Sequence, residues 1–419
     1  MTFLARTTSP LPARFLRTLT GVCLPLLAAW SLTGCETPDR SRGALHPDHR
    51  PSQEMQDPGE EGAEGAATSL LDVRAQPATF GLDSLLLTRA VDRASQQTRL
   101  HNMLVVRHGE VALERHFRGP SPGQPANVKS VSKSILSALV GLAIHHGHLE
   151  GIDATIAPFF PDYLPPEAQG ESPEDGPADG DEDLRSRITM EHLLSMSSGL
   201  ETTSNRNYGR WVASSNWVRY ALTRPMGFAA GTRRSYSTGN THLASAVLTR
   251  ATGQSTHAFA REALAEPLSI DLPRWPQDPQ GVYFGGNDML VSPRDLARFG
   301  ELFRRGGTLD SVELLSREWI EESWAIRTRA QRSGNGYGLA WWARQSGGHE
   351  IRFAWGYGGQ FLFVVPALEL TVVFTSDPWS PREGNHNQVL HRILDDFLIP
   401  AAERGSEGSA PATGTDETH

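Results

Sequence analysis

A serine and a lysine stand three residues apart at the start of an apolar segment. These are Ser130 and Lys133, followed by residues 135–143 with the sequence ILSALVGLA. The apolar run predicts a buried helix, and residues three apart lie on the same face of a helix. The hydroxyl and the amine should therefore point into the same space. A serine hydroxyl becomes an effective nucleophile when an adjacent base takes its proton, and a neutral lysine amine can be that base.

The use of lysine in this chain supports a chemical role. The sequence has 39 Lys plus Arg, yet only Lys129 and Lys133 are lysines. Arginine is effectively always protonated, whereas a lysine amine can lose its proton when it is desolvated or crowded by positive charge. A chain that otherwise uses arginine thus keeps lysine where a free amine would be needed. The structural alternative is a helix-capping serine followed by a surface lysine.

Two further motifs follow in the chain. Residues 236–240 (YSTGN) come after a glycine-rich stretch and before a predicted helix, which indicates a loop that begins with Tyr236. Residues 354–360 (AWGYGGQ) lie between two predicted strands. Glycines in a strand allow a ligand or another backbone segment to approach closely.

This ordered set of motifs resembles the serine β-lactamase and penicillin-recognising superfamily. It is most similar to the class C-like branch that includes esterases and nylon-oligomer (6-aminohexanoate-dimer) hydrolases. Residues 192–200, 283–290 and 337–342 fit the same likeness, which covers roughly residues 80–400.

The resemblance implies a cofactor-free acyl-enzyme mechanism without a metal. Ser130 would attack a carbonyl group, and Lys133 would accept its proton if the amine is neutral. Tyr236 would relay the proton to the leaving group and help to activate water. The oxyanion would be bound by the Ser130 backbone N–H and by a second N–H from a four-residue segment. The candidates for that second donor are Tyr357, Gly358, Gly359 and Gln360.

The chain also departs from the family pattern. Where β-lactamases and D,D-peptidases have Lys-Thr-Gly, this chain has residues 356–358 (GYG), without the cation that helps to hold a substrate carboxylate. Where class C enzymes have an asparagine, it has Thr238, so Asn240 could serve only through a different backbone path. Both departures favour an ester or a linear amide without the usual carboxylate anchor. Trp341 is a candidate for a substrate pocket, although aromatic residues at strand spacing are also typical of a core.

The order of the predicted elements indicates an α+β fold, an α/β sandwich of the β-lactamase/D,D-peptidase type. Strands near both chain ends predict one antiparallel sheet flanked by helices, with a mostly helical subdomain at about 150–330. The hydrolase domain should cover residues 79–400. An acidic insertion is expected at 165–186, where residues 167–183 contain eight acids and no base. Residues 401–419 should be a disordered tail.

The N-terminus predicts export and a lipid anchor. Residues 1–34 combine an arginine-containing start with an apolar run, as in a secretory signal peptide. They end in Leu-Thr-Gly before Cys35, which resembles a bacterial lipoprotein cleavage site with Cys35 lipidated. Residues 35–78 would be a flexible tether. We therefore expect a lipid-anchored, extracytoplasmic protein of the bacterial cell envelope that contacts the membrane through its anchor.

Other classes of function are disfavoured by the sequence. The net charge of −9 offers no nucleic-acid surface. The histidines at 145, 146 and 148 lie at a predicted helix end and are better explained as capping residues than as a metal site. The expected function is a serine hydrolase acting on a small-molecule ester or amide. The alternative is a penicillin-binding or cell-wall-fragment-sensing protein that is acylated with little turnover.

Overall fold

The computed structural model describes residues 77–164, 184–379 and 384–407, all within one compact unit of the chain, residues 54–419. The predicted signal peptide with Cys35 and nearly all of the predicted tether and acidic insertion lie outside the described residues. Among the helices of the described residues, none combines the length and the apolar character needed to cross a membrane.

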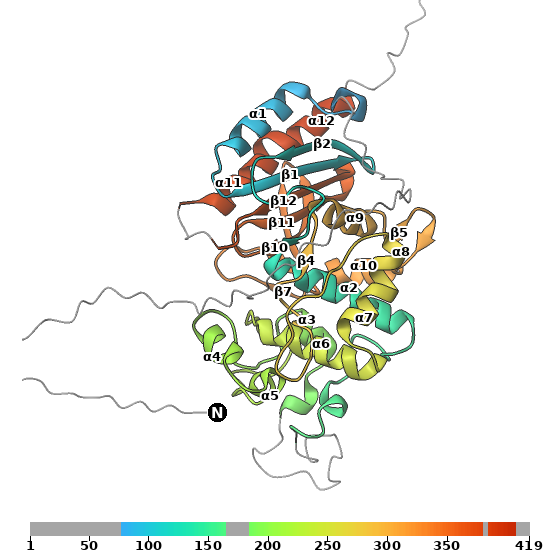
Figure 1. Ribbon diagram of the computed structural model, residues 1–419, viewed down its shortest axis with the longest axis vertical. Helices are drawn as coiled ribbons and strands as arrows, with labels where there is room; N and C mark the ends of the chain where they lie inside the picture. Colours follow the sequence, from blue (N-terminus) through green and yellow to red (C-terminus); the bar gives the residue numbers. More distant parts are fainter. Residues whose placement is uncertain (1–76, 165–183, 380–383, 408–419) are drawn as a thin grey trace, which may run out of the picture. The chain divides into compact units, whose positions relative to one another are not determined.

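An antiparallel sheet is the main element of the fold. Within the described residues it has eight strands, in the order β2 (Glu110–His116), β1 (Leu100–Arg107), β12 (Leu370–Ser376), β11 (Gln360–Val365), β10 (His349–Gly356), β9 (Trp342–Ser346), β8 (Gly336–Tyr337) and β7 (Thr328–Arg329). An early strand, β1, pairs with the last strand, β12. The prediction of an α+β fold with a sheet assembled from both chain ends is therefore confirmed (Figure 1).

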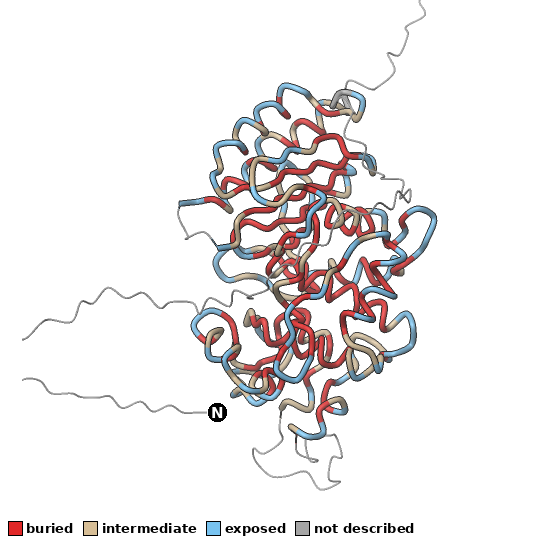
Figure 2. Tube along the Cα trace, viewed as in Figure 1, coloured by how far each residue is buried: buried red, intermediate tan, exposed pale blue. Residues whose placement is uncertain are grey.

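Alternate residues of β1 face two different cores because successive side chains of a strand point to opposite sides. Met103 and Val105 belong to one core, and Leu104 and Val106 to the other. The first core is covered by α1 (Ser84–Ser95), α11 (His386–Ile393) and α12 (Ile399–Glu407). The second is covered by α2 (Ser132–His145) and α9 (Pro293–Arg304). Figure 2 shows the strands buried between these layers.

A block of mostly short helices follows α2 in the chain. It contains α3 (Met190–Leu194), α4 (Tyr208–Val212), α5 (Trp217–Leu222), α6 (Thr238–Thr252), α7 (Thr256–Ala260), α8 (Glu266–Leu268) and α10 (Arg317–Trp324). These helices occupy the range for which the sequence predicts a helical subdomain. Helix α9 lies in the same range, but it packs on strands β11 and β12 of the sheet.

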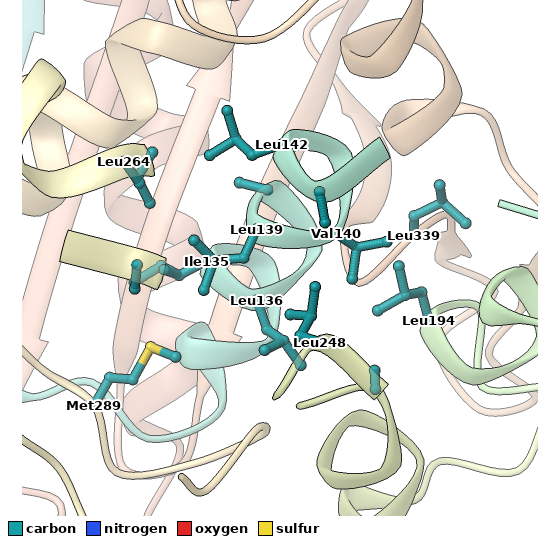
Figure 3. Close-up of a cluster of buried hydrophobic side chains, with 14 of the residues drawn as sticks. Ile135, Leu136, Leu139, Val140, Leu142, Leu194, Leu248, Leu264, Met289 and Leu339 are labelled. Atoms are coloured by element: carbon teal, nitrogen blue, oxygen red, sulfur yellow. The ribbon is translucent and has the colours of Figure 1, made fainter. Parts of the chain in front are cut away.

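Helix α2 lies between the sheet and the helical block. Twelve of its fourteen residues are buried, and a helix that is apolar on all sides is a buried helix. In Figure 3 its side chains, among them Ile135 and Leu139, contact residues from several other elements of the fold. The start of α2 is thus surrounded by protein and held in a fixed position.

The folded domain extends beyond the predicted boundary at residue 400. Helix α12 continues to Glu407, and Ala401 and Ala402 are fully buried. The prediction of a tail from residue 401 is wrong for these residues. Pro400 does not end the helix because it falls in the first turn of α12, after a π-helical turn, where its missing N–H is tolerated. Residues 408–419 lie outside the described residues.

The packing of α2 predicts a strong effect of one methyl group. A Cβ added at Gly141 would overlap the ring of Trp319, which is buried. We expect Gly141→Ala to lower the free energy of unfolding by about 1–3 kcal/mol through overpacking, measured by urea denaturation of the full chain. Gly209→Ala is the control, because a Cβ in this helical position meets nothing within 4 Å. Equal stability of the two variants would contradict the packing described.

Candidate active site

Ser130 and Lys133 meet where α2 begins. Ser130 lies in the short 3₁₀ turn η2 (Lys129–Val131), directly before the helix, and Lys133 follows in its first turn. The Lys133 Nζ lies 3.0 Å from the Ser130 Oγ, a hydrogen-bond distance. Ser130 is half-buried, whereas the lysine is 1% exposed. The hydroxyl is thus reachable from solvent while the amine behind it is enclosed.

The burial of Lys133 changes its chemistry. Burial lowers the pKa of its amine to about 7, and the nearby carboxylate of Asp288 opposes this shift. Desolvation has this effect because it disfavours the charged form of the amine. A large fraction of the amine is therefore neutral near pH 7 and able to accept a proton from Ser130.

Two further acceptors contact the amine. Its Nζ donates a hydrogen bond to the backbone carbonyl of Gly286 and lies 3.4 Å from the Oγ1 of Thr238. A side chain at position 286 would overlap the hydroxyl of Thr241 and come within 3.2 Å of Nζ. Glycine at 286 therefore lets the carbonyl reach the lysine. The sequence signal was the pair of glycines at 285 and 286, which a simple turn explains equally well.

Tyr236 is the third side chain of the group. Burial raises the pKa of its hydroxyl to about 12, and a hydrogen bond with the Ser130 side chain acts in the opposite direction. The Lys133 Nζ is 5.1 Å from the centre of the tyrosine ring. The structure thus brings the three predicted catalytic side chains together, from η2, α2 and the loop before α6.

The loop that carries Tyr236 is fixed by hydrogen bonds to an earlier segment. The Thr202 hydroxyl donates to the Tyr236 carbonyl at 2.6 Å, and the Ser235 N–H donates to the Met196 carbonyl at 2.8 Å. The Thr238 N–H donates to the Ser204 hydroxyl at 2.8 Å. The segment after α3 therefore positions the tyrosine, in agreement with the likeness noted for residues 192–200.

Lys129, the other lysine of the chain, lies immediately before the serine. Its backbone has φ +49°, unusual for a residue other than glycine. Its Nζ forms a 2.8 Å ion pair with Asp288 and lies 3.6 Å from the centre of the Trp379 ring. These contacts hold the strained turn that presents Ser130. They also place an ammonium beside the carboxylate that acts on Lys133.

Strand β10 approaches this turn at Gly356. A Cβ at this position would overlap the carbonyl of Val128 and come within 3.1 Å of the Lys129 Cβ. The predicted oxyanion segment lies just beyond. Tyr357 is 38% exposed, and Gly358 and Gly359 form the following turn with φ +88° and +102°.

One of the predicted backbone donors in that segment has an internal partner. The Gly359 N–H donates to the Gly356 carbonyl at 3.4 Å. The side chain of Gln360, as distinct from its backbone N–H, is fully buried and bonds the backbone N–H and carbonyl of Ser376. The second oxyanion donor among residues 357–360 stays a prediction.

Asn240 and Trp341 do not face the site, which corrects the prediction for both. Because α6 begins at Thr238, Asn240 turns inward; it is 1% exposed and its Oδ1 accepts from the Ser198 hydroxyl. Thr238 faces the lysine in its place. Trp341 is 1% exposed and stacks on Phe299 and Phe303 in the core.

No group of three or more His, Cys, Asp or Glu that could hold a metal ion occurs among the described residues. The histidines at 145, 146 and 148 contact one another and Phe259 through their rings near the end of α2.

Comparison with known proteins places this arrangement in context. A 6-aminohexanoate-dimer hydrolase from Paenarthrobacter ureafaciens is 26% identical over 331 residues, which cover 72% of this chain and 79% of that protein. The octameric penicillin-binding protein homologue from Pyrococcus abyssi shares the fold, with a TM-score of 0.57, 16% identity, and coverage of 77% of this chain and 78% of that chain. EstCE1, a hydrolase with promiscuous acyltransferase activity, has a TM-score of 0.60, 18% identity, and coverage of 74% and 98%. The family described as Beta-lactamase matches residues 87–393. The chain belongs to the beta-lactamase family.

Proposed function

We propose that this protein is a cofactor-free serine hydrolase that cleaves an ester or a linear amide through an acyl-enzyme on Ser130. The observation that carries the proposal is the 3.0 Å contact between the Ser130 Oγ and a buried Lys133 amine whose pKa is lowered to about 7. The relative named for hydrolysis of an aminohexanoate dimer, a linear amide, supports the choice of substrate class. The enzyme would be attached to the membrane through the tether that the sequence predicts.

Acylation follows from the positions of the three side chains. The Ser130 oxygen forms a bond to the carbonyl carbon while its proton passes to the neutral Lys133 amine. The resulting oxyanion would be stabilised by the Ser130 N–H together with a second backbone N–H from residues 357–360. The bond to the leaving group then breaks, and Tyr236 transfers the proton from Lys133 to the departing oxygen or nitrogen.

Deacylation uses the same groups in reverse. Water attacks the acyl carbon and gives its proton to the Lys133–Tyr236 pair, and the Ser130 oxygen leaves and recovers its proton. Tyr236 is suited to a relay because its raised pKa keeps it protonated at neutral pH. Lys133 is suited to be the base because its lowered pKa matches the pH at which the enzyme would work.

Replacement of the nucleophile is the first test. We expect Ser130→Ala to lose at least about 10³-fold in kcat/KM on p-nitrophenyl esters and on the 6-aminohexanoate dimer. A fluorophosphonate probe should label the wild-type chain at Ser130 and leave this variant unlabelled. Ser95→Ala, which changes an exposed serine of α1, is the control.

Retained hydrolysis in Ser130→Ala would contradict the proposal. Stable labelling of Ser130 by penicillin, with no product released from any of these substrates, would instead favour the sensing function.

The lysine predicts the pH dependence. Below its pKa of about 7 the Lys133 amine is protonated and cannot accept the serine proton, so activity is lost as the pH falls. We expect kcat/KM for a neutral ester to rise through pH about 7 and then to level off, and Lys133→Met to be inactive at every pH. An acid limb near pH 4 would indicate a carboxylate base and would refute the role of the amine.

We predict that loss of the ion pair between Lys129 and Asp288 shifts the acid limb of the pH profile. Lys129→Met leaves Asp288 without its partner, and an unpaired carboxylate favours the protonated form of Lys133. The acid limb should therefore move to higher pH, by about one pH unit. Adding Asp288→Asn removes the carboxylate as well and should move the limb back. A lower rate with an unmoved limb would mean that Lys129 acts only through the backbone turn.

A further inference from the structure

A guanidinium with unpaired donors lies beside Tyr236. Arg234 precedes the tyrosine by two residues, and its Cζ lies over three aromatic rings, at 5.6 Å from the centre of Tyr236, 4.8 Å from Tyr337 and 4.7 Å from Trp342. Its Nε and Nη2 atoms are buried and have no hydrogen-bond partner. Within the described residues no carboxylate pairs with this arginine.

Packing alone does not account for this residue. A guanidinium gains about 0.5–2 kcal/mol over an aromatic ring, whereas each buried N–H left without an acceptor costs about 1–3 kcal/mol. Other partly buried arginines of the chain are paired. Arg294 binds Glu114 through two 2.8 Å hydrogen bonds, and Arg344 binds Asp395 at 2.7 Å. Arg234 has the same forked donors and lacks the planar acceptor that would match them.

The position of Arg234 tells which part of a substrate it would meet. Both basic side chains lie near the ring of Tyr236, since the Lys133 Nζ is 5.1 Å and the Arg234 Cζ 5.6 Å from its centre. In the proposed mechanism Tyr236 delivers a proton to the leaving group. A leaving group that receives this proton departs next to the tyrosine, in the neighbourhood of the guanidinium.

We infer that Arg234 binds a carboxylate carried by the leaving group of the substrate. The inference rests on the proposed function and narrows its substrate class to esters or amides of hydroxy acids or amino acids. The substrate carboxylate would accept hydrogen bonds from the guanidinium, while the aliphatic or aromatic part of the leaving group would contact Trp342, which is half-buried. An arginine from the tyrosine loop would thus supply the cation that the glycine-rich strand lacks.

Matched substrates with and without a charge test this inference. One pair is 4-acetoxybenzoate and 4-acetoxybenzamide, and the other is the 6-aminohexanoate dimer and its C-terminal amide. The measured quantity is the ratio of two kcat/KM values. The first is for the substrate with the carboxylate, and the second is for the matched substrate in which a primary amide replaces that carboxylate. Because charge-assisted hydrogen bonds contribute about 1.5–3 kcal/mol, this ratio should fall by about 10- to 100-fold in Arg234→Met. Arg234→Lys, which keeps the charge and loses the fork, should give a smaller fall.

The neighbouring arginine is the matched control. Arg233 is exposed and its Cζ lies over the Phe228 ring, 5.7 Å from the centre. Arg233→Met should leave the ratio unchanged. A ratio that stays constant in Arg234→Met, with both substrates slowed alike, would overturn the inference and assign the guanidinium to support of Tyr236. An equal fall in Arg233→Met would also overturn it, since it would show only a general effect of charge.

A binding measurement separates this inference from the proposed function. Calorimetric titration of the full-length Ser130→Ala protein needs no turnover. It should bind 4-hydroxybenzoate more tightly than 4-hydroxybenzamide, and the additional Arg234→Met change should remove the preference. If this holds while the wild type hydrolyses nothing, the hydrolase proposal fails and the carboxylate site stands. If Ser130-dependent hydrolysis is found without any Arg234-dependent preference, the hydrolase proposal stands and the carboxylate site fails.

Discussion

The site depends on keeping the amine of Lys133 out of water. A lysine in water remains protonated until the pH approaches its pKa of about 10.4. An ammonium at hydrogen-bond distance from Ser130 could not accept the proton of the serine hydroxyl. In the proposed mechanism, burial is therefore the feature that allows this side chain to act as a base. The surrounding structure supplies it, with the sheet on one side of α2 and the helical block on the other. The neutral amine remains satisfied because it donates to the Gly286 carbonyl and lies near the Thr238 hydroxyl.

Nearby charges strongly affect the pKa of a buried amine, and Lys133 has charged groups of both signs around it. Asp288 favours the ammonium form, but its carboxylate is shared with Lys129. It also accepts a hydrogen bond from Asn127 at 2.9 Å, so part of its charge is directed toward the serine turn. The ion pair between Lys129 and Asp288 thus supports the strained backbone before Ser130. It also reduces the effect of the Asp288 charge on the Lys133 amine. Arg234 also lies near Tyr236, and its positive charge opposes the rise that burial causes in the pKa of the phenol.

The sequence predicted the parts of the site that depend on local spacing. Ser130 and Lys133 follow from helix periodicity, and the sheet follows from the order of the strands. Gly286 and Asp288 were missed as site residues because their role requires a turn, distant in sequence, to fold against α2. Asn240 was misplaced because the face it occupies depends on where α6 begins, and a shift of two residues turns a side chain from the site to the interior. Trp341 was misassigned because a core contact and a substrate contact leave the same pattern in a strand.

The pairing of β1 with β12 has a consequence for how the protein folds. The Asn102 side chain donates to the Thr375 hydroxyl at 2.9 Å across a sequence separation of 273 residues. Closing so long a segment costs chain entropy before any contact repays it, and folds rich in such contacts form slowly. The strands nearest the nucleophile belong to the same sheet, so the half of the site contributed by β10 cannot form on a nascent chain that lacks its C-terminal quarter. We therefore expect the candidate site to be complete only after the segment from β10 to β12 has been synthesised.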